Sequence, residues 1–285
     1  MFAINKVLLA IVVYEEKFYE TVVYSSLIRS LREIRMDDFE IAIYDNTDTP
    51  DWKINCDVVP EQHNIIYHHD PENPGISKAY NYMAKLAASE GKEWIIFFDQ
   101  DTEVPANAIE QYLRAIEEKP DVALKAAILH VGAKIFSPSK YLFKKSIALL
   151  DISPGLYSLN KIVVVNSGLA VDLDLFFKAG GYNEKVRLDF ADFQFIERVR
   201  TVTDTVEILP VTCKHGFSDN ESNVLKALKR YSFFVEDMLN CQRRNLADHF
   251  GFLIVDLSRL VKLSMKFRSL RFLTLRLKKI GTRNG

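Results

Sequence analysis

The sequence has few cysteines, no long hydrophobic run and almost no net charge, and each absence excludes a class of protein. The three cysteines, Cys56, Cys213 and Cys241, are far apart and form no C-x-x-C pair, so neither structural disulfides nor a thiolate zinc site is expected. The apolar run within residues 1–17 is about eight residues long, whereas a membrane-spanning helix needs roughly 20. It also lacks the cleavage site of a signal peptide. We expect a buried first strand there, and a reducing compartment.

The C-terminal segment from Arg259 onward lacks acidic residues. From Arg259 onward there are nine basic residues and no acidic one, although the whole chain has a formal net charge of −1. The preceding part therefore carries −10, so an acidic body is followed by a basic tail. This overall balance does not predict nucleic-acid binding.

Hydrophobic patterning predicts an α/β fold with a mostly parallel sheet, flanking helices and C-terminal amphipathic helices. Apolar runs typical of buried parallel strands alternate with helical spacing, in the order β-α-β-β-α-β-α through about residue 120. The expected strands are 7–13, 39–46, 64–69 and 93–101, and the expected helices lie within 18–34, 73–92 and 105–120. Further on we expect a strand leading into a helix within 161–176, a helix within 180–200, a strand over 205–216 and helices from Val224. We divide the chain into a domain over 1–222 and a helical basic region over 223–285.

Acidic residues follow the fourth expected strand, in the segment I-I-F-F-D-Q-D. In doubly wound sheets ligands bind beyond the carboxyl ends of the strands. Asp99 and Asp101 stand one residue apart at such an end, where desolvation and mutual repulsion disfavour both charges. A divalent cation that also binds phosphate oxygens resolves this cost, and Mn²⁺ and Mg²⁺ suit such ligands. A solvated turn is the alternative.

Two further segments offer contacts for a nucleotide. Asp45 ends the second strand, where its carboxylate can accept a hydrogen bond from a pyrimidine base, although an Asx-turn explains it as well. Asn73 and Gly75 precede a helix whose N-terminus can face an anion. An ordinary turn is the alternative for that segment.

Three residues of the second half offer proton transfer or metal binding. Asp189 and Asp192 are three residues apart and share a helical face if a helix has begun, so one of them can be a general base for an acceptor hydroxyl. The alternative is that both are acidic residues at a helix N-terminus, where the helix dipole favours negative charge. His215 ends a strand, where it can complete a metal shell or be structural.

In this order the motifs resemble the family 2 inverting glycosyltransferases of the GT-A fold, most of all the bacterial rhamnosyltransferase group that builds surface polysaccharides such as O-antigen and capsule. The resemblance spans roughly residues 5 to 220. It implies that Val13, Tyr14, Asp45, Asn73, Gly75, Asn81, Asp99 and Gln100 contact the donor, that Ser167, Gly168 and Asp189 lie near the sugar or acceptor, and that Asp99, Asp101 and His215 hold the metal.

The same resemblance implies the chemistry. Asp192 is the implied catalytic base, and it deprotonates the acceptor hydroxyl in a single in-line displacement that inverts the anomeric centre. Mn²⁺ or Mg²⁺ neutralises the departing diphosphate. The implied donor is dTDP-rhamnose or a UDP-sugar, and the implied acceptor is a glycan or a lipid-linked sugar. Gln194 departs from the group, which usually has a glutamate there.

The basic tail adds a membrane hypothesis. Leu260, Leu263, Phe267, Leu270, Leu273 and Leu277 recur at steps of three and four, with basic residues between them. A basic amphipathic helix of this kind binds anionic membrane surfaces, so we expect a cytoplasmic protein peripheral to the inner face of the cell membrane. A core-packing or oligomerising helix is the alternative.

Two other functions remain open. One is a non-catalytic nucleotide-sugar-binding module of the same fold. The other is a sugar nucleotidyltransferase, a class that usually has a glycine-rich basic loop after the first strand. The segment V-V-Y-E-E-K-F-Y-E has no glycine, which argues against the second.

Overall fold

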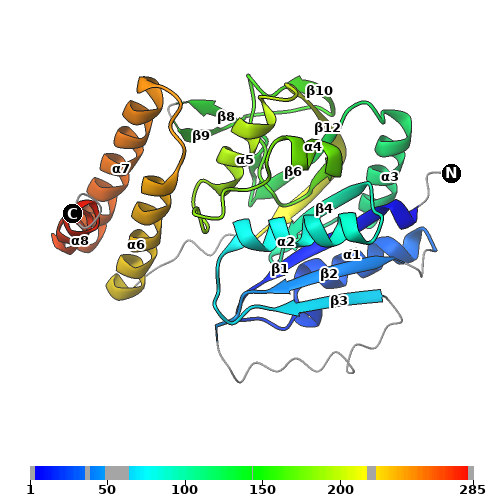
Figure 1. Ribbon diagram of the computed structural model, residues 1–285, viewed down its shortest axis with the longest axis horizontal. Helices are drawn as coiled ribbons and strands as arrows, with labels where there is room; N and C mark the ends of the chain where they lie inside the picture. The colour runs from blue at the N-terminus through cyan, green and yellow to red at the C-terminus, as the bar shows by residue number, and fades with distance from the viewer. Residues whose placement is uncertain (1–3, 36–38, 49–63, 143, 217–222, 282–285) are drawn as a thin grey trace.

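A computed structural model describes residues 4–35, 39–48, 64–142, 144–216 and 223–281. A central sheet has helices on both faces, and three C-terminal helices stand together at one side of it (Figure 1). The sheet strands are β1 (Val7–Val13), β2 (Glu40–Asp45), β3 (Asn64–His69), β4 (Trp94–Asp99), β5 (Thr102–Glu103), β6 (Leu124–Val131), β7 (Lys134–Ser137), β10 (Gly155–Ser158), β11 (Leu169–Asp172) and β12 (Thr205–His215), while β8 (Ser139–Leu142) and β9 (Lys145–Ala148) form a separate hairpin. The α-helices are α1 (Val22–Glu33), α2 (Ile76–Ser89), α3 (Ala108–Glu118), α4 (Leu173–Lys178), α5 (Ala191–Val199), α6 (Val224–Asn240), α7 (Leu246–Phe267) and α8 (Arg271–Gly281).

The main path of the sheet runs β10-β12-β6-β11-β4-β1-β2-β3. Strands β3, β2, β1 and β4 are parallel, and β12 is parallel to β6, whereas β11 is antiparallel to both of its neighbours. The predicted mostly parallel α/β sheet is therefore confirmed, with β11 inserted antiparallel in its middle and the short strands β5, β7 and β10 added antiparallel at one side. Val13 pairs with Asp45 and Val12 with Asp99, so the carboxyl ends of β2, β1 and β4 lie side by side.

Strand β1 shows why the sheet is covered on both sides. Its alternate residues Leu8, Ala10 and Val12 join the core beneath α2, and the intervening ones join the core beneath α1 and α3. Side chains alternate between the two faces of a strand, so a strand buried on both faces needs an unbroken apolar run. This is the physical origin of the V-L-L-A-I-V-V segment.

The C-terminal helices extend the core of the sheet domain. Tyr231 and Phe234 of α6, Phe252 of α7 and Phe272 of α8 are buried in the same cluster as the α2 side of the sheet. Ion pairs add to this packing, with Arg276 2.6 Å from the buried Asp256. Region 223–281 therefore shares its core with the preceding domain. Within the described residues no helix is both long and apolar enough to cross a membrane.

The strand leading into a helix expected within 161–176 is confirmed as β11 followed directly by α4, while Val163 makes only an isolated bridge to Ser139. Other features differ from the expectations. Strands β6 to β10 were not predicted. The basic tail is two helices, since the chain leaves the helix at Arg268 with φ of 47°. Leu260 of the expected membrane face is buried, and Leu263 and Phe267 pack against the core, because α7 turns that face inward.

Candidate active site

Several of the predicted site residues lie at one edge of the sheet. Parallel strands β1, β2 and β4 all end there, and the turn that begins the antiparallel β11 reaches the same edge. This brings Tyr14, Asp45, Asp99 and Ser167 from distant parts of the chain to one edge. Such an edge is where ligands bind in doubly wound sheets, and the geometry follows from strand direction alone.

Asp99 is fixed by two neighbours. The hydroxyl of Tyr80, on α2, donates to Asp99 Oδ1 over 2.6 Å, and the Asp99 backbone N–H donates to Ser167 Oγ over 3.0 Å. The Tyr80 hydroxyl is held as a donor, because burial and the Asp99 charge raise its pKa well above the usual value. One carboxylate oxygen of Asp99 is therefore occupied by protein.

Asp101 lies beside His215 at the end of β12. His215 Nδ1 is 3.3 Å from Asp101 Oδ1 and 2.9 Å from Thr102 Oγ1, which in turn is 2.7 Å from Ser167 Oγ. Burial raises the pKa of Asp101 to about 6, with the Asp99 charge acting in the same direction and His215 against it. A carboxylate so disfavoured is stabilised by a cation.

The donor set fits a divalent ion that needs more than protein ligands. Among the described residues no three His, Cys, Asp or Glu side chains are arranged to hold a metal. Mg²⁺, however, is usually held by one or two carboxylates, with substrate phosphates and water completing its shell. Asp99 and Asp101 offer two such carboxylates, so they fit an ion that arrives with a diphosphate. His215 contacts Asp101 through Nδ1, which leaves only Nε2 for a metal.

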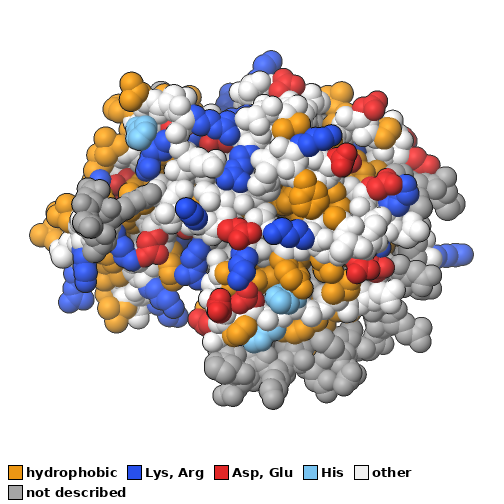
Figure 2. Space-filling model, viewed as in Figure 1, with side chains coloured by type: hydrophobic (Ala, Val, Ile, Leu, Met, Phe, Trp, Pro, Cys, Tyr) orange, Lys and Arg blue, Asp and Glu red, His pale blue; other side chains and the backbone are white. Residues whose placement is uncertain are grey.

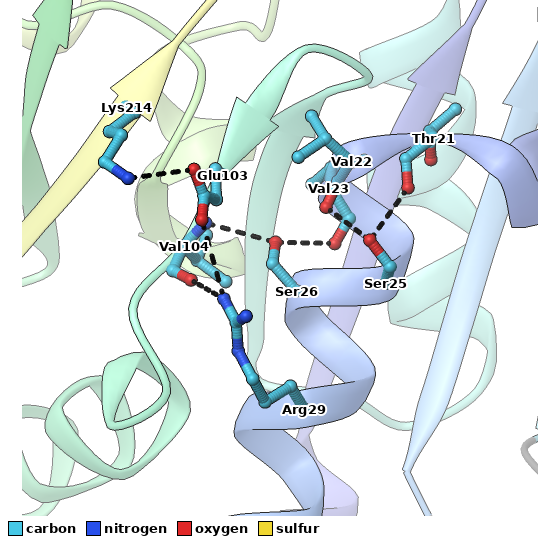
Figure 3. Close-up of polar contacts among 9 residues, drawn as sticks. All are labelled: Thr21, Val22, Val23, Ser25, Ser26, Arg29, Glu103, Val104 and Lys214. Carbon is cyan, nitrogen blue, oxygen red and sulfur yellow. Dashed lines mark hydrogen bonds and ion pairs between the residues drawn. The ribbon is translucent and has the colours of Figure 1, made fainter.

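Strand β5, directly after Asp101, is fastened to α1 and β12 (Figure 3). The Val104 N–H donates to Ser26 Oγ over 3.1 Å, and Arg29 donates to the Val104 carbonyl over 3.3 Å. The Glu103 carboxylate lies 3.8 Å from the Arg29 guanidinium and 3.2 Å from Lys214 Nζ. These contacts fix the turn that follows Asp99 and Asp101.

Gln100, predicted as a donor contact, links this turn to the end of β1. The Tyr14 N–H donates to Gln100 Oε1 over 2.6 Å, and Gln100 Nε2 donates to the Tyr14 carbonyl over 3.2 Å and to Glu16 over 2.9 Å. Val13 accepts from the Asn46 N–H over 2.9 Å. The Gln100 amide therefore positions the backbone of Tyr14, whose ring is 36% exposed and available to a planar base.

Asp45 is already rich in partners. Oδ1 accepts from the N–H and hydroxyl of Thr47, at 2.9 and 2.6 Å, and Oδ2 accepts from the Tyr67 hydroxyl at 2.6 Å. The carboxylate is fully buried. The Thr47 contacts are those of an Asx-turn, so the structure favours the alternative over a base contact. A carboxylate has about four lone-pair sites, and a base would have to use the remaining one.

The segment before α2 makes a close backbone crossing. Arg187 donates to the Asn73 carbonyl, and the Ile76 N–H donates to the Arg187 carbonyl over 2.8 Å. Gly75, with φ of 97°, lies so near that a Cβ would stand 2.3 Å from the Arg187 carbonyl oxygen. Asn81 on the same helix is buried and bonds Tyr182 and Glu184 with its whole amide. Gly75 and Asn81 therefore hold the segment before α5 in place, a role that sequence did not suggest.

We expect Gly75→Ala to lower the free energy of unfolding by about 3 kcal/mol, because it adds a backbone clash to a left-handed backbone conformation. Gly91→Ala is the matched control: Gly91 has φ of 71° but nothing within 4 Å of a Cβ. Gly91→Ala should lower the free energy of unfolding by only about 1–2 kcal/mol, because alanine disfavours the left-handed backbone conformation. Urea unfolding of both variants measures the difference, and equal losses would show that the crossing does not matter.

Asp192, the predicted base, is in the first turn of α5. Asn166 donates its amide N–H to Asp192 Oδ1, and the Tyr182 hydroxyl donates to Asn166 Oδ1 over 2.5 Å. Burial raises the pKa of Asp192 to about 8, and the negative charge of Asp99 adds to the shift. This charge coupling places the two carboxylates in one electrostatic site. A general base works best with a pKa near the working pH.

The remaining predicted residues divide between packing and an adjacent cleft. Gly168, with φ of 70°, has no room for a side chain, since a Cβ would be 2.9 Å from Ala127 Cβ. Ser167 contacts Asp99 and Thr102 and is part of the site. Asp189 instead faces the C-terminal helices, where it pairs with Arg230 of α6 and Arg259 of α7.

A cleft of about 810 Å³ separates α5 from α6 and α7. Asp101 and His215 line one end of it, and Phe190 and Phe193, which flank Asp192, line one side. The opposite wall includes basic side chains of α6 and α7. The cleft therefore opens onto Asp101 and runs toward the C-terminal helices.

The sequence analysis missed three residues that are distant in the sequence but form hydrogen bonds to the predicted site residues. Tyr80 contacts Asp99, Asn166 contacts Asp192 and Thr102 contacts His215. Asn166 had a signal, since it directly precedes Ser167 and Gly168. Tyr80 lies within the α2 segment already singled out, but nothing in the spacing marks its hydroxyl.

Residues 9–164 match the sequence family described as Glycosyl transferase family 2. The chain belongs to this family. That confirms the expected family, although Asp192 and His215 lie beyond the matched residues. Over 154 residues the chain is 22% identical to the dTDP-rhamnosyl transferase RfbF of Shigella flexneri. The aligned segment covers 53% of this chain and 52% of that protein. The match thus spans about half the length of this curated relative.

Solved structures, two of them in complex with nucleotide sugars, share the fold of this chain. S. aureus TarS 1-349 in complex with UDP-GlcNAc has a TM-score of 0.56 at 13% identity, covering 97% of this chain and 80% of that one. The mannosyltransferase PcManGT of Pyrobaculum calidifontis, in complex with GDP-Man and Mn²⁺, has a TM-score of 0.52 at 13% identity, covering 98% and 81%. At such identities the likeness establishes the fold, and it confirms the expected GT-A architecture of this family 2 chain.

Proposed function

We propose that the protein is a metal-dependent inverting glycosyltransferase that moves a sugar from a nucleoside-diphosphate donor to a hydroxyl of a glycan or lipid-linked acceptor. The observation that carries this is that Asp99 and Asp101 lie at one edge of the sheet, with the buried Asp192 near enough for the Asp99 charge to raise its pKa. Family membership and the nucleotide-sugar complexes of the structural neighbours support it. The rhamnosyl transferase relative favours dTDP-rhamnose as the first donor to test.

Each group of the site has a part in this chemistry. When bound at Asp99 and Asp101, Mn²⁺ or Mg²⁺ neutralises charge on the leaving diphosphate. Ser167 and Tyr80 hold Asp99, and His215 and Thr102 hold the neighbouring turn. The exposed ring of Tyr14 offers a surface for the base. Asp192, oriented by Asn166, takes the proton of the acceptor hydroxyl as that oxygen forms the new bond.

A donor screen tests this function. Purified protein with Mn²⁺ or Mg²⁺ is incubated with dTDP-rhamnose, UDP-galactose and other UDP-sugars, with and without a lipid-linked acceptor, and release of nucleoside diphosphate is measured. We expect release with one donor, dependent on the metal and stimulated by acceptor. If no nucleotide-sugar binds or turns over under any condition, the protein is not this enzyme. Binding without turnover would instead indicate a nucleotide-sugar-binding module.

We further propose that the enzyme attaches to an anionic membrane surface through α7 and α8. Exposed apolar residues recur along one side of α7 at steps of three and four, and we call Phe250, Leu253, Leu257, Val261 and Met265 the apolar stripe. Leu270, Leu273 and Leu277 add exposed apolar surface on α8. Figure 2 shows hydrophobic and basic side chains mixed along the edge formed by these helices. This combination suits a lipid interface with anionic headgroups.

The pair Val261→Ser and Met265→Ser should weaken membrane binding about tenfold or more, since each removes a side chain that would be buried in the lipid. The two residues are 54% and 73% exposed, so folding should be unaffected. Flotation with vesicles containing phosphatidylglycerol measures the effect. Leu150→Ser with Leu156→Ser, exposed apolar residues outside α7 and α8, is the control. Equal flotation of both pairs would refute the membrane role.

A further inference from the structure

The segment 186–190 leads directly into α5 and so decides where Asp192 lies. It is neither helix nor strand, and its last residue, Phe190, has a left-handed backbone with φ of 67°. Such a conformation is costly for a residue other than glycine and persists only where the surrounding structure holds it. One side of the segment is held by α2, where Ser77 Oγ donates to the Val186 carbonyl over 2.5 Å. The other side is held by α6.

Asp237 of α6 binds this segment through three consecutive backbone N–H groups. The Arg187 N–H donates to Oδ1 over 2.7 Å, and the N–H groups of Leu188 and Asp189 donate to Oδ2 over 2.9 and 2.8 Å. The Asp237 side chain is 1% exposed, and its burial raises the pKa of Asp237 although the three bonds oppose the shift. A buried carboxylate without such bonds is strongly unfavourable, so the segment and Asp237 depend on each other.

Polar contacts with α6 and the residues just after it continue on both sides of this segment. Before it, Asn240 Nδ2 donates to the Lys185 carbonyl over 2.9 Å. After it, Gln194 Oε1 accepts from the Gln242 N–H over 3.2 Å, and Gln194 Nε2 donates to the Gln242 carbonyl over 3.1 Å. An ionised glutamate, the usual residue at this position in the group, could accept but could not donate. The chain that enters α5 is therefore attached to α6 at several successive points.

We propose that Asp237 is a positioning residue for the catalytic base, and that α6 sets the place of Asp192 through it. The inference rests on the proposed glycosyl transfer. Asp237 is not among the described residues that line the cleft, so it acts through the backbone of 187–189 and not on a substrate. The opposite neighbour of this segment, α2, carries Tyr80, the partner of Asp99. Loss of the Asp237 contacts therefore displaces the base relative to Asp99 while α2 stays in place.

Two substitutions of Asp237 test this with the donor that the screen identifies. Asp237→Asn removes one of the two acceptor oxygens. Asp237→Glu keeps the charge but extends the side chain by one methylene, so it separates position from charge. We expect each to lower kcat for sugar transfer by about tenfold to a hundredfold, since a small misplacement of a reacting group has a large cost. Affinity for the nucleoside diphosphate with Mn²⁺ should change by less than about twofold, because α2 keeps its contacts.

Combination with Asp192→Asn distinguishes positioning from a general structural role. If Asp237 acts through the base, adding Asp237→Asn to Asp192→Asn should lower the residual rate by less than about twofold, since residues that act as a unit are not additive. A residue that only supports the fold would lower the rate by the same factor in both backgrounds. Rates are expressed per folded protein, with the folded fraction measured by urea unfolding.

Asp256→Asn is the matched control. Asp256 is also 1% exposed on a C-terminal helix, but its described partners are Tyr231 of α6 and Arg276 of α8. Its loss should reduce stability, because it leaves a buried charge without a partner, and should leave kcat per folded protein unchanged.

Three results would overturn the proposal while the glycosyltransferase assignment stands: an unchanged kcat in an Asp237 variant that folds, an equal loss in the Asp192→Asn background, or an equal loss in Asp256→Asn. Failure of both Asp237 variants to fold would assign Asp237 to folding and overturn it as well. If the wild type transfers no sugar from any donor, the proposed function itself fails.

Discussion

Asp192→Asn should strongly slow sugar transfer and make the protein more stable. The amide keeps the shape of the side chain and still accepts from Asn166, but it cannot take a proton from the acceptor hydroxyl. Loss of a general base lowers the rate by about 10²–10⁴-fold. Binding of the nucleoside diphosphate should be retained, because Asp192 is implied to act on the acceptor. The measurement is transfer under saturating donor together with nucleotide binding.

The stability of this variant follows from the raised pKa of Asp192. Its pKa is about 8 in the folded protein, against about 3.9 for an unfolded aspartate. Between these values the folded state holds a proton that the unfolded state has lost, so wild-type stability falls as pH rises from about 4 to about 8. The asparagine variant lacks this loss. Urea unfolding at pH 5, 6, 7 and 8 should show its advantage growing with pH.

Asp174→Asn is the control for both measurements, because Asp174 is exposed on α4 and pairs only loosely with Lys178, 3.7 Å away. It should change neither transfer nor the pH dependence of stability. The wild-type rate should also rise with pH as Asp192 loses its proton, and this limb should be absent from the residual rate of Asp192→Asn. If Asp192→Asn kept full transfer activity, another group would be the base.

The strand ends were predictable, and their partners were not. Apolar runs that stop at Asp45 and Asp99 mark both the strands and the edge of the sheet where they end, since the change from apolar to polar residues is a local property of the sequence. The role of Asp45 depends on Tyr67 from the neighbouring strand, and that of Asp192 depends on Asn166. Those contacts are set by the sheet order, which spacing along one chain does not reveal.

The C-terminal helices show a second limit of pattern analysis. A search for one apolar face assumes that a helix meets its surroundings on one side, and it selected Leu260, Leu263 and Phe267. Helix α7 has three environments instead: the core at Leu260, the cleft at Lys262 and an exposed apolar side at Val261. Periodicity shows that such a helix is amphipathic, but only the packing of α6 and α8 decides which face is buried.

The other large effect concerns the two carboxylates after β4. Asp99→Asn combined with Asp101→Asn should abolish transfer and remove any stabilisation of the protein by Mn²⁺ with nucleoside diphosphate. In the wild type a ligand at 100 times its Kd adds about 2.7 kcal/mol to the free energy of unfolding. Without ligand the double variant should be at least as stable as wild type, because burial and the Asp99 charge already disfavour the charge of Asp101 and raise its pKa to about 6. Thermal unfolding with and without Mn²⁺ and nucleotide measures this.

Glu103→Gln provides the matched control for that experiment. Glu103 is a carboxylate two residues after Asp101, but its side chain turns to Arg29 and Lys214 (Figure 3). Its loss should cost at most about 1 kcal/mol of stability, as for other exposed ion pairs, and should keep the response to Mn²⁺. If both variants lose the response equally, the turn as a whole matters rather than its two aspartates. If the double variant transfers sugar at the wild-type rate, the phosphates of the donor are held without these carboxylates.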